Sequence, residues 1–201
     1  MSEVKTKRLI LGITGGIASG KSTVMRALAR AGIPTVSSDV LAHQAIFKAT
    51  SVHRRILRRY GRGILRSSGQ ISRRTLGHIV FRDPAERRWL ERQVHPVVIR
   101  TLKQFIRAHH GIVALDIPLL FEARLQNLVD KVIVVYSSRE LQIKRLRRRD
   151  GLSRQNALQR IAAQIPLGAK RRHADIVLDN RGTPPALRSQ IRRLLKDLNR
   201  T

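Results

Sequence analysis

The sequence predicts a three-layer α/β fold in which a five-stranded parallel sheet lies between helices. Short apolar, β-branched runs alternate with longer helical segments along the chain, as expected of successive βαβ units. The chain has 201 residues, which is enough for one core with modest insertions. Its apolar fraction of 42% excludes a disordered basic chain.

The expected elements follow in order along the chain. RLILGIT at 8–14 is an apolar run typical of a buried strand, and PTVSSD at 34–39 reads as a second, short strand. Pro96 is expected in the first turn of a helix over 96–110. Further strands are expected at 112–118, 131–138 and 174–180, and further helices at 21–31, 139–149, 153–165 and 185–199.

Residues 40–110 form a helical, strongly basic stretch that is too long for a simple crossover between two strands. We therefore expect an insertion with its own lobe at 40–110 and a smaller, Arg-rich appendage at 139–172.

Basic residues far outnumber acidic ones, with 41 Lys and Arg against 13 Asp and Glu, a formal charge of +28. Such a charge favours nucleic acid or another anionic partner. The seven aromatic residues are scattered, however, whereas single-strand binders interleave rings with cations. A basic solvated surface with only non-specific nucleic-acid contact is the favoured interpretation.

The chain has no cysteine, which excludes disulfides and thiol chemistry and fits a reducing compartment. Lys5, Lys7 and Arg8 precede an apolar run and so imitate a signal peptide, but Thr14 and the following glycines interrupt that run. No apolar run is long enough to span a membrane. A cytoplasmic location without a membrane partner is expected.

GGIASGKS at 15–22 matches the phosphate-loop pattern G-x-x-x-x-G-K-[ST] between a predicted strand and a predicted helix. Glycines let backbone N–H groups converge on phosphates at the positive end of the helix. Lys21 is expected to reach the β- and γ-phosphates, and the Ser22 hydroxyl to bind Mg²⁺. The alternative is a glycine-rich turn with a solvated lysine.

Two aspartates are expected at the carboxyl ends of strands, where open α/β sheets bind ligands. Asp116 follows the run IVAL and is expected to hold the metal directly or through water. Asp39 is then available to accept a hydrogen bond from an incoming hydroxyl. An N-cap of the helix beginning at 40 is an equally supported role for Asp39.

Arg145, Arg148 and Arg149 are spaced to share one helix face. Such a cluster can close over a triphosphate, bind nucleic acid or simply be solvated.

These motifs carry a family resemblance. GITGGIASGKST (12–23), the pair His95-Pro96, LDIPLLFE (115–122), QIKRLRRRDGLS (142–153) and RIAAQIPLGAKRRHADIVLDN (160–180) resemble the dephospho-CoA kinases. The resemblance implies a P-loop NTPase-type fold, with 1–39, 111–144 and 174–201 as the nucleotide-binding core, 40–110 as the substrate lobe and 145–173 as the lid. It also implies transfer of the γ-phosphate of ATP, with Mg²⁺, to the ribose 3′-hydroxyl of dephospho-CoA.

The resemblance also implies roles for individual residues. Catalytic roles are implied for Asp39 as the base, Lys21 and Arg145. ATP contacts are implied for Gly16, Ala18, Ser19, Gly20, Lys21, Ser22, Thr23, Arg145, Arg149 and Asn180. Acceptor contacts are implied for Asp39, Arg73, His95, Pro118, Leu119, Leu120 and Glu122.

Two positions depart from the family pattern. Ser37 stands where many members carry a further acid, and Ala18 stands where glycine is common, so ordinary backbone geometry is expected at 18. Another P-loop nucleoside or nucleotide kinase, or a nucleic-acid-binding P-loop NTPase, is the alternative function. A monomer or weak homo-oligomer is expected.

Overall fold

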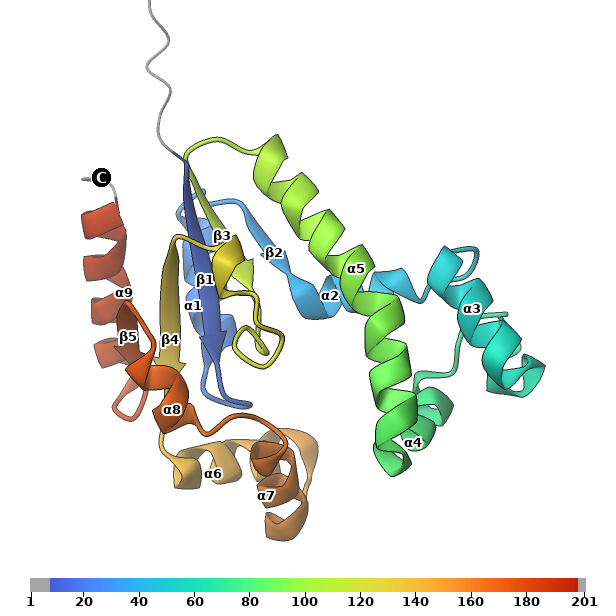
Figure 1. Ribbon diagram of the computed structural model, residues 1–201. Coiled ribbons are helices and arrows are strands. Elements are labelled where there is room, and N and C mark those ends of the chain that lie inside the picture. Colours follow the sequence, from blue (N-terminus) through green and yellow to red (C-terminus); the bar gives the residue numbers. More distant parts are fainter. Residues whose placement is uncertain (1–7, 199–201) are drawn as a thin grey trace, which may run out of the picture. The chain divides into compact units, whose positions relative to one another are not determined.

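The computed structural model describes residues 8–198 and confirms the predicted fold class. A five-stranded parallel sheet has the order β2-β3-β1-β4-β5, with β1 at its centre (Figure 1). Its strands are β1 (Leu9–Gly15), β2 (Thr35–Ser37), β3 (Ile112–Asp116), β4 (Lys131–Tyr136) and β5 (Ile176–Asp179). Lys5 and Lys7, which belong to the signal-peptide interpretation, lie outside the described residues.

The register of the strands brings the carboxyl ends of β1, β2 and β3 together at one edge of the sheet. Asp116 pairs with Ile13 of β1 on one side and with Ser37 of β2 on the other. Gly15, which ends β1, pairs with Val135 of β4. The chain leaves β1, β2 and β3 at this carboxyl edge, where parallel sheets bind their ligands.

One face of the sheet is covered by α1 (Lys21–Arg30) and α9 (Pro184–Leu198), seen in blue and red in Figure 1. Leu11 and Ile13 of β1 are fully buried in this layer against Val24 and Leu28 of α1. Burying such a side chain is worth roughly 1.5–3 kcal/mol, so this layer holds the start of α1 firmly against β1.

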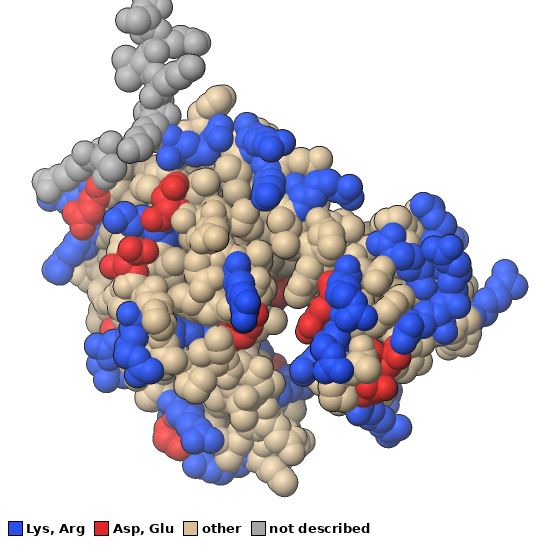
Figure 2. Space-filling view, in the orientation of Figure 1, with Lys and Arg blue, Asp and Glu red and all other residues tan. Residues whose placement is uncertain are grey.

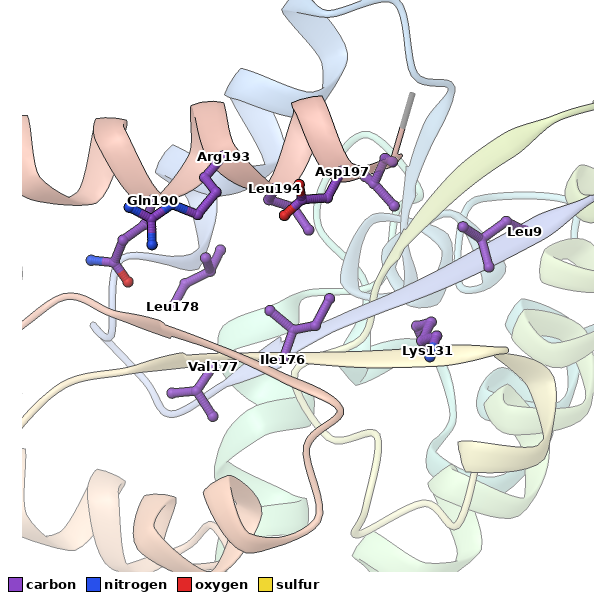
Figure 3. Close-up of a pocket in the computed structure, with 10 residues that line it drawn as sticks. Leu9, Lys131, Ile176, Val177, Leu178, Gln190, Arg193, Leu194 and Asp197 are labelled. Carbon is purple, nitrogen blue, oxygen red and sulfur yellow. The ribbon is translucent and has the colours of Figure 1, made fainter. Parts of the chain in front are cut away.

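A hollow of about 380 Å³ lies between α9 and β5 (Figure 3). Leu178, Leu194 and Ile176 give it a largely apolar wall. None of the residues that line it belongs to the phosphate loop, so this hollow is separate from the predicted nucleotide site.

Three further helices follow β4. They are α6 (Arg139–Asp150), α7 (Arg154–Ala162) and α8 (Leu167–Arg172), and the short 3₁₀ turn η2 (Gln126–Leu128) precedes β4. The Ser138 and Ser153 hydroxyls accept hydrogen bonds from N-terminal amides of α6 and α7, respectively. Gly151 ends α6 in a left-handed conformation. Ile143, Leu146 and Ala157 form a small core between α6 and α7.

The chain divides into two compact units, one of Met1–Ser37 with Ile106–Thr201 and one of Ser38–Phe105. The second unit is helical because capped amphipathic segments succeed one another. Thr50 caps α3 and Ser72 caps α4. The helices that lie wholly or mainly in this unit are α2 (Ser38–Ala45), α3 (Ser51–Tyr60), η1 (Arg62–Ile64), α4 (Arg73–Arg82) and α5 (Pro84–Ala108).

A polar cluster joins α3 to α5 within the second unit. Arg59 Nε donates to Glu86 Oε2 at 2.7 Å, and the Tyr60 hydroxyl donates to the same carboxylate. These bonds, first from Arg59 and then from Tyr60, lower the pKa of Glu86 to about 2. Burial, followed by the bond to Glu86, raises the pKa of Tyr60 to about 12. The Arg59 guanidinium also lies 4.7 Å from the centre of the Trp89 ring.

Three expected boundaries are wrong. Strand β2 ends at Ser37, and Asp39 lies in the first turn of α2, because Ser-Asp favours a helix start over a strand end. Pro96 lies inside α5, which begins at Pro84. Proline removes one helical N–H, but Val94 and Val98 on either side are buried and hold the helix together. The helix expected over 153–165 ends at Ala162 and is followed by α8.

None of the helices in the described part of the chain is both long and apolar enough to cross a membrane.

Candidate active site

The phosphate loop, residues 15–22, forms a tight strand-to-helix connection. Ser19 N donates to Gly16 O at 3.0 Å, and Gly20 takes a left-handed conformation with φ of 98° immediately before α1. A Cβ at Gly20 would lie 2.1 Å from Asn180 Nδ2, and one at Gly16 would lie 2.4 Å from Gln142 Nε2. Both glycines are therefore needed for neighbouring side chains to approach the loop backbone.

The start of α1 is suited to an anion. Its N-cap residue is Gly20, which has no side chain to cap the N-terminal amides, and the first turn contains no acidic residue. Its unpaired N–H groups and the positive end of the helix dipole therefore remain available to a phosphate. Lys21 and Ser22 are the first two residues of this turn, and Ser22 is exposed.

Lys21 and Asp116 form an ion pair at the mouth of the loop. Both side chains are partly buried, with 15% and 17% of their surface exposed. The structure thus brings together the predicted phosphate-binding lysine and the carboxylate that ends β3. A second cation at this carboxylate would compete directly with the Lys21 ammonium.

The oxygen atoms at this edge fit Mg²⁺. Mg²⁺ prefers oxygen ligands and is usually held by one or two carboxylates together with substrate phosphates. Ser22 supplies a hydroxyl and Asp116 a carboxylate next to the predicted phosphate position. Among the described residues no group of three or more His, Cys, Asp or Glu could form a protein-only metal cage.

Both backbone polar groups of Ile17 in the phosphate loop are held by amide side chains. Gln142 Nε2 of α6 donates to Ile17 O at 2.7 Å, and Ile17 N donates at 2.8 Å to Oε1 of Gln164, which follows α7. These two amide side chains therefore fix the orientation of the two peptide groups that flank the Ile17 Cα.

Arg145 and Asn180 hold the next loop carbonyls. Arg145 Nη1 lies 3.3 Å from both Ala18 O and Ser19 O, and its Nη2 donates to Asn180 O at 2.9 Å. Asn180 Nδ2 donates to Ser19 O at 2.7 Å. Because these carbonyls accept hydrogen bonds from Arg145 and Asn180, the loop backbone is held in one shape and its amides remain available to phosphate.

The backbone at Ala18 differs from the expected geometry. Its φ is 57°, in the left-handed region that costs a residue with a Cβ roughly 1–2 kcal/mol. The expectation of ordinary backbone geometry at this position is wrong, because the turn between Ile17 and Ser19 requires a positive φ.

The arginines of α6 have different partners. Arg149 pairs with Asp150 at 2.7 Å, and this bond lowers the pKa of the Asp150 carboxyl. Arg148, together with Lys144 and Arg147, lines a hollow whose walls contain no residue of the phosphate loop. Arg145 alone among the three predicted arginines contacts the phosphate loop.

The turn after β3 contains four of the predicted acceptor-side residues, Pro118, Leu119, Leu120 and Glu122. Leu119 exposes 43% of its surface, whereas Leu120 is fully buried, so Leu119 is the leucine of this pair that can offer its side chain to a ligand. Pro118 O accepts from Thr14 Oγ1 at 3.1 Å. Glu122 forms an ion pair with the buried Lys170 at 2.7 Å.

The turn after β5 lies beside the loop through Asn180. Arg181 pairs with Asp179, and this hydrogen bond lowers the pKa of the Asp179 carboxyl. The guanidinium groups of Arg171 and Arg181 lie 5.1 and 5.4 Å from the ring centre of Tyr136. The buried Asn180 therefore lies between two residues that are paired with each other.

The second unit contains the other predicted residues. Asp39 is in the first turn of α2, one position past the residue where that helix begins. Arg73 is the first residue of α4, and His95 lies in the middle of α5; both are exposed.

Sequence reasoning missed four residues that support the site, namely Thr14, Gln142, Gln164 and Lys170. Each lies inside a stretch that carries the family resemblance. Uncharged amides and a lysine among many basic residues give no separate signal, because their role depends on which backbone atoms they reach.

Comparisons with known proteins agree with this geometry. The family model described as dephospho-CoA kinase matches residues 9–185. A dephospho-CoA kinase of Thermosynechococcus vestitus is 47% identical, covering 92% of this chain and 93% of its own.

Two solved structures are also similar. The Thermus thermophilus protein TT1252 aligns with a TM-score of 0.81 at 35% identity, covering 95% of this chain and 98% of its own. A dephospho-CoA kinase from Campylobacter jejuni aligns with a TM-score of 0.73 at 28% identity, covering 96% and 98%. The family model spans both compact units and every predicted site residue, and the chain therefore belongs to the dephospho-CoA kinase family.

Proposed function

We propose that this kinase transfers the γ-phosphate of ATP to the ribose 3′-hydroxyl of dephospho-CoA, giving CoA and ADP. The observation that carries the proposal is a phosphate loop shaped for a triphosphate in a chain whose family model covers residues 9–185. The family membership supports the acceptor, and the loop geometry supports the donor.

On the donor side, the amides of the phosphate loop and of the first turn of α1 bind the β- and γ-phosphates. Lys21 adds its ammonium to the transferring group, which requires the ion pair with Asp116 to loosen or to be shared. The proposed ATP contacts comprise Gly16, Ala18, Ser19, Gly20, Lys21, Ser22, Thr23, Arg145, Arg149 and Asn180. Positioning and charge stabilisation dominate catalysis of such a loose transition state.

On the acceptor side, Asp39 accepts the proton of the 3′-hydroxyl as its oxygen bonds to the γ-phosphorus. The bond between that phosphorus and the oxygen of the leaving ADP breaks, and Asp39 later releases its proton to solvent. The proposed acceptor contacts are Arg73, His95, Pro118, Leu119 and Glu122, whereas the buried Leu120 is proposed to support Leu119 from beneath the turn. In this proposal residues 40–110 bind the acceptor, 145–173 form the lid, and 1–39, 111–144 and 174–201 form the core.

Ser22 and Asp116 are proposed to hold Mg²⁺ with the ATP phosphates. The ion would neutralise charge on the β- and γ-phosphate oxygens. A monomer or weak homo-oligomer and a cytoplasmic location stay predictions from the sequence.

The test is turnover with purified protein, ATP, Mg²⁺ and dephospho-CoA, with ADP and CoA both measured. ADP and CoA should form in equal amounts, and adenosine in place of dephospho-CoA should give far less ADP. ADP release without CoA, or faster turnover with a nucleoside, would assign the chain to a different phosphoryl-transfer reaction.

A further inference from the structure

We infer that Lys170 is a positioning residue for the acceptor-side turn Pro118–Glu122, an inference that rests on the proposed function. The side chain of Lys170, on α8, has 0% of its surface exposed. A buried ammonium is costly unless acceptors surround it. Lys170 Nζ finds two, because it donates to Pro118 O at 2.9 Å and lies 2.7 Å from Glu122 Oε1.

These two acceptors are the first and last residues of the turn. Lys170 therefore holds both of its ends, while Leu119 between them projects to the surface. The position of Leu119 depends on the ends that Lys170 holds.

Each end of the turn is also bonded to a further segment. Pro118 O accepts from the buried Thr14 Oγ1 on β1, one residue before the phosphate loop. Glu122 Oε1 accepts from Ile165 N, in the connection between α7 and α8 at 3.0 Å. Lys170 thus joins the turn to α8, while separate bonds tie the same turn to β1 and to the connection between α7 and α8.

Little else among the described residues could take over this role. The other carboxylate oxygen, Glu122 Oε2, is buried without a hydrogen-bond partner. A hollow of about 480 Å³ beside Lys170 is lined mainly by apolar side chains, including Phe121, Val132 and Ile165. Loss of the ammonium would leave the Glu122 carboxylate with a single amide and free the turn to shift toward this hollow.

The phosphate loop, in contrast, is held by other side chains. Gln142, Gln164, Arg145 and Asn180 fix its peptide groups without any bond to Lys170. Loosening the turn should therefore affect the acceptor more than ATP.

The experiment compares Lys170→Met with Gln142→Leu in steady-state kinetics, varying each substrate separately. Lys170→Met should raise KM for dephospho-CoA about tenfold while changing KM for ATP less than about twofold. Gln142→Leu should show the reverse pattern. Lys170→Arg, which retains a cation, should recover part of the loss, and Lys196→Met on the exposed side of α9 should match the wild type.

A buried lysine can also be needed for folding, so Glu122→Gln provides a second route. It keeps the shape and the acceptor for Ile165 N while removing the charge of the pair. It should raise KM for dephospho-CoA in the same direction when assayed at a temperature where circular dichroism shows the variant to be folded, although loss of the buried pair should lower its unfolding temperature.

Equal increases in both KM values, or unchanged acceptor KM in a folded Lys170→Met and in Glu122→Gln, would overturn the inference. A wild-type protein that fails to convert dephospho-CoA would instead refute the proposed function. The two failures are therefore distinguished by the wild-type assay alone.

Discussion

Ala18 occupies a left-handed position in the phosphate loop, and this makes it a site where a smaller residue should stabilise the protein. Ala18→Gly removes a backbone strain of roughly 1–2 kcal/mol from the folded protein. It also stabilises the unfolded chain by roughly 0.5–1 kcal/mol, because glycine has more conformational freedom there. The net gain should be about 0.5–1 kcal/mol, or roughly 1–4 °C in unfolding temperature. Thermal unfolding followed by circular dichroism measures it.

Ala27→Gly is the matched control, because Ala27 lies in the interior of the regular helix α1. There the same substitution should cost about 1 kcal/mol. Two changes of the same sign would show that the φ angle of Ala18 is not the cause.

Lys21 and Asp39 should separate donor binding from proton transfer. Lys21→Ala removes the main cation at the transferring phosphate and should lower kcat/KM by about 100-fold or more. Asp39→Asn should lower kcat by about 100-fold or more, with the dissociation constant of ATP changed less than about threefold. Calorimetry with an ATP analogue and steady-state assays measure both. If Asp39→Asn weakened ATP binding as much as turnover, Asp39 would have a structural role at the start of α2.

At the scale of single elements, the contact between α3 and α5 should make stability depend on acidity. The pKa of Glu86 is lowered to about 2 in the folded protein, against an ordinary value of 4.5. The unfolded chain therefore binds more protons between these values, and the contribution of Glu86 to stability is full above about pH 4.5 and is lost as pH falls toward 2. Glu86→Gln should flatten the fall in unfolding temperature over this range.

Glu91→Gln is the control for this measurement. Glu91 is exposed, and its pair with Arg87 is long, at 3.9 Å. This substitution should leave the pH dependence of unfolding close to that of the wild type. A Glu86→Gln profile that parallels the wild type would contradict the assignment of the acid-sensitive contact to Glu86.

The element order could be predicted because hydrophobic periodicity and loop glycines act locally. The strand around Ile13 and the helix after Gly20 follow from their own residues. The extent of α5 could not be predicted, because burial of Val94 and Val98 overrides the local preference of Pro96 to start a helix. The partners of Arg145 were equally hidden, because they are backbone oxygens from segments far away in sequence.

At the scale of the whole molecule, the charge of +28 should cause non-specific binding to polyanions. Basic side chains are spread over both compact units on the face shown in Figure 2, and acidic ones are fewer. A distributed charge of this kind attracts phosphate backbones without reading bases.

The affinity of the protein for a fluorescent oligonucleotide should therefore fall steeply with the logarithm of salt concentration, by about 10³-fold or more between 50 and 200 mM. It should be nearly equal for oligonucleotides of different sequence. A sequence-specific complex that survives at 200 mM salt would reveal a dedicated nucleic-acid site. Catalytic turnover in the same buffers separates this electrostatic attraction from phosphoryl transfer.

Gln142 and Gln164 hold the two backbone polar groups of Ile17, and this links two events that would otherwise be independent. Gln142 lies in α6 and Gln164 follows α7, so moving these two segments apart breaks one bond or displaces Ile17. Separation of α6 from the segment that follows α7 and loss of the shape of the phosphate loop are then a single event.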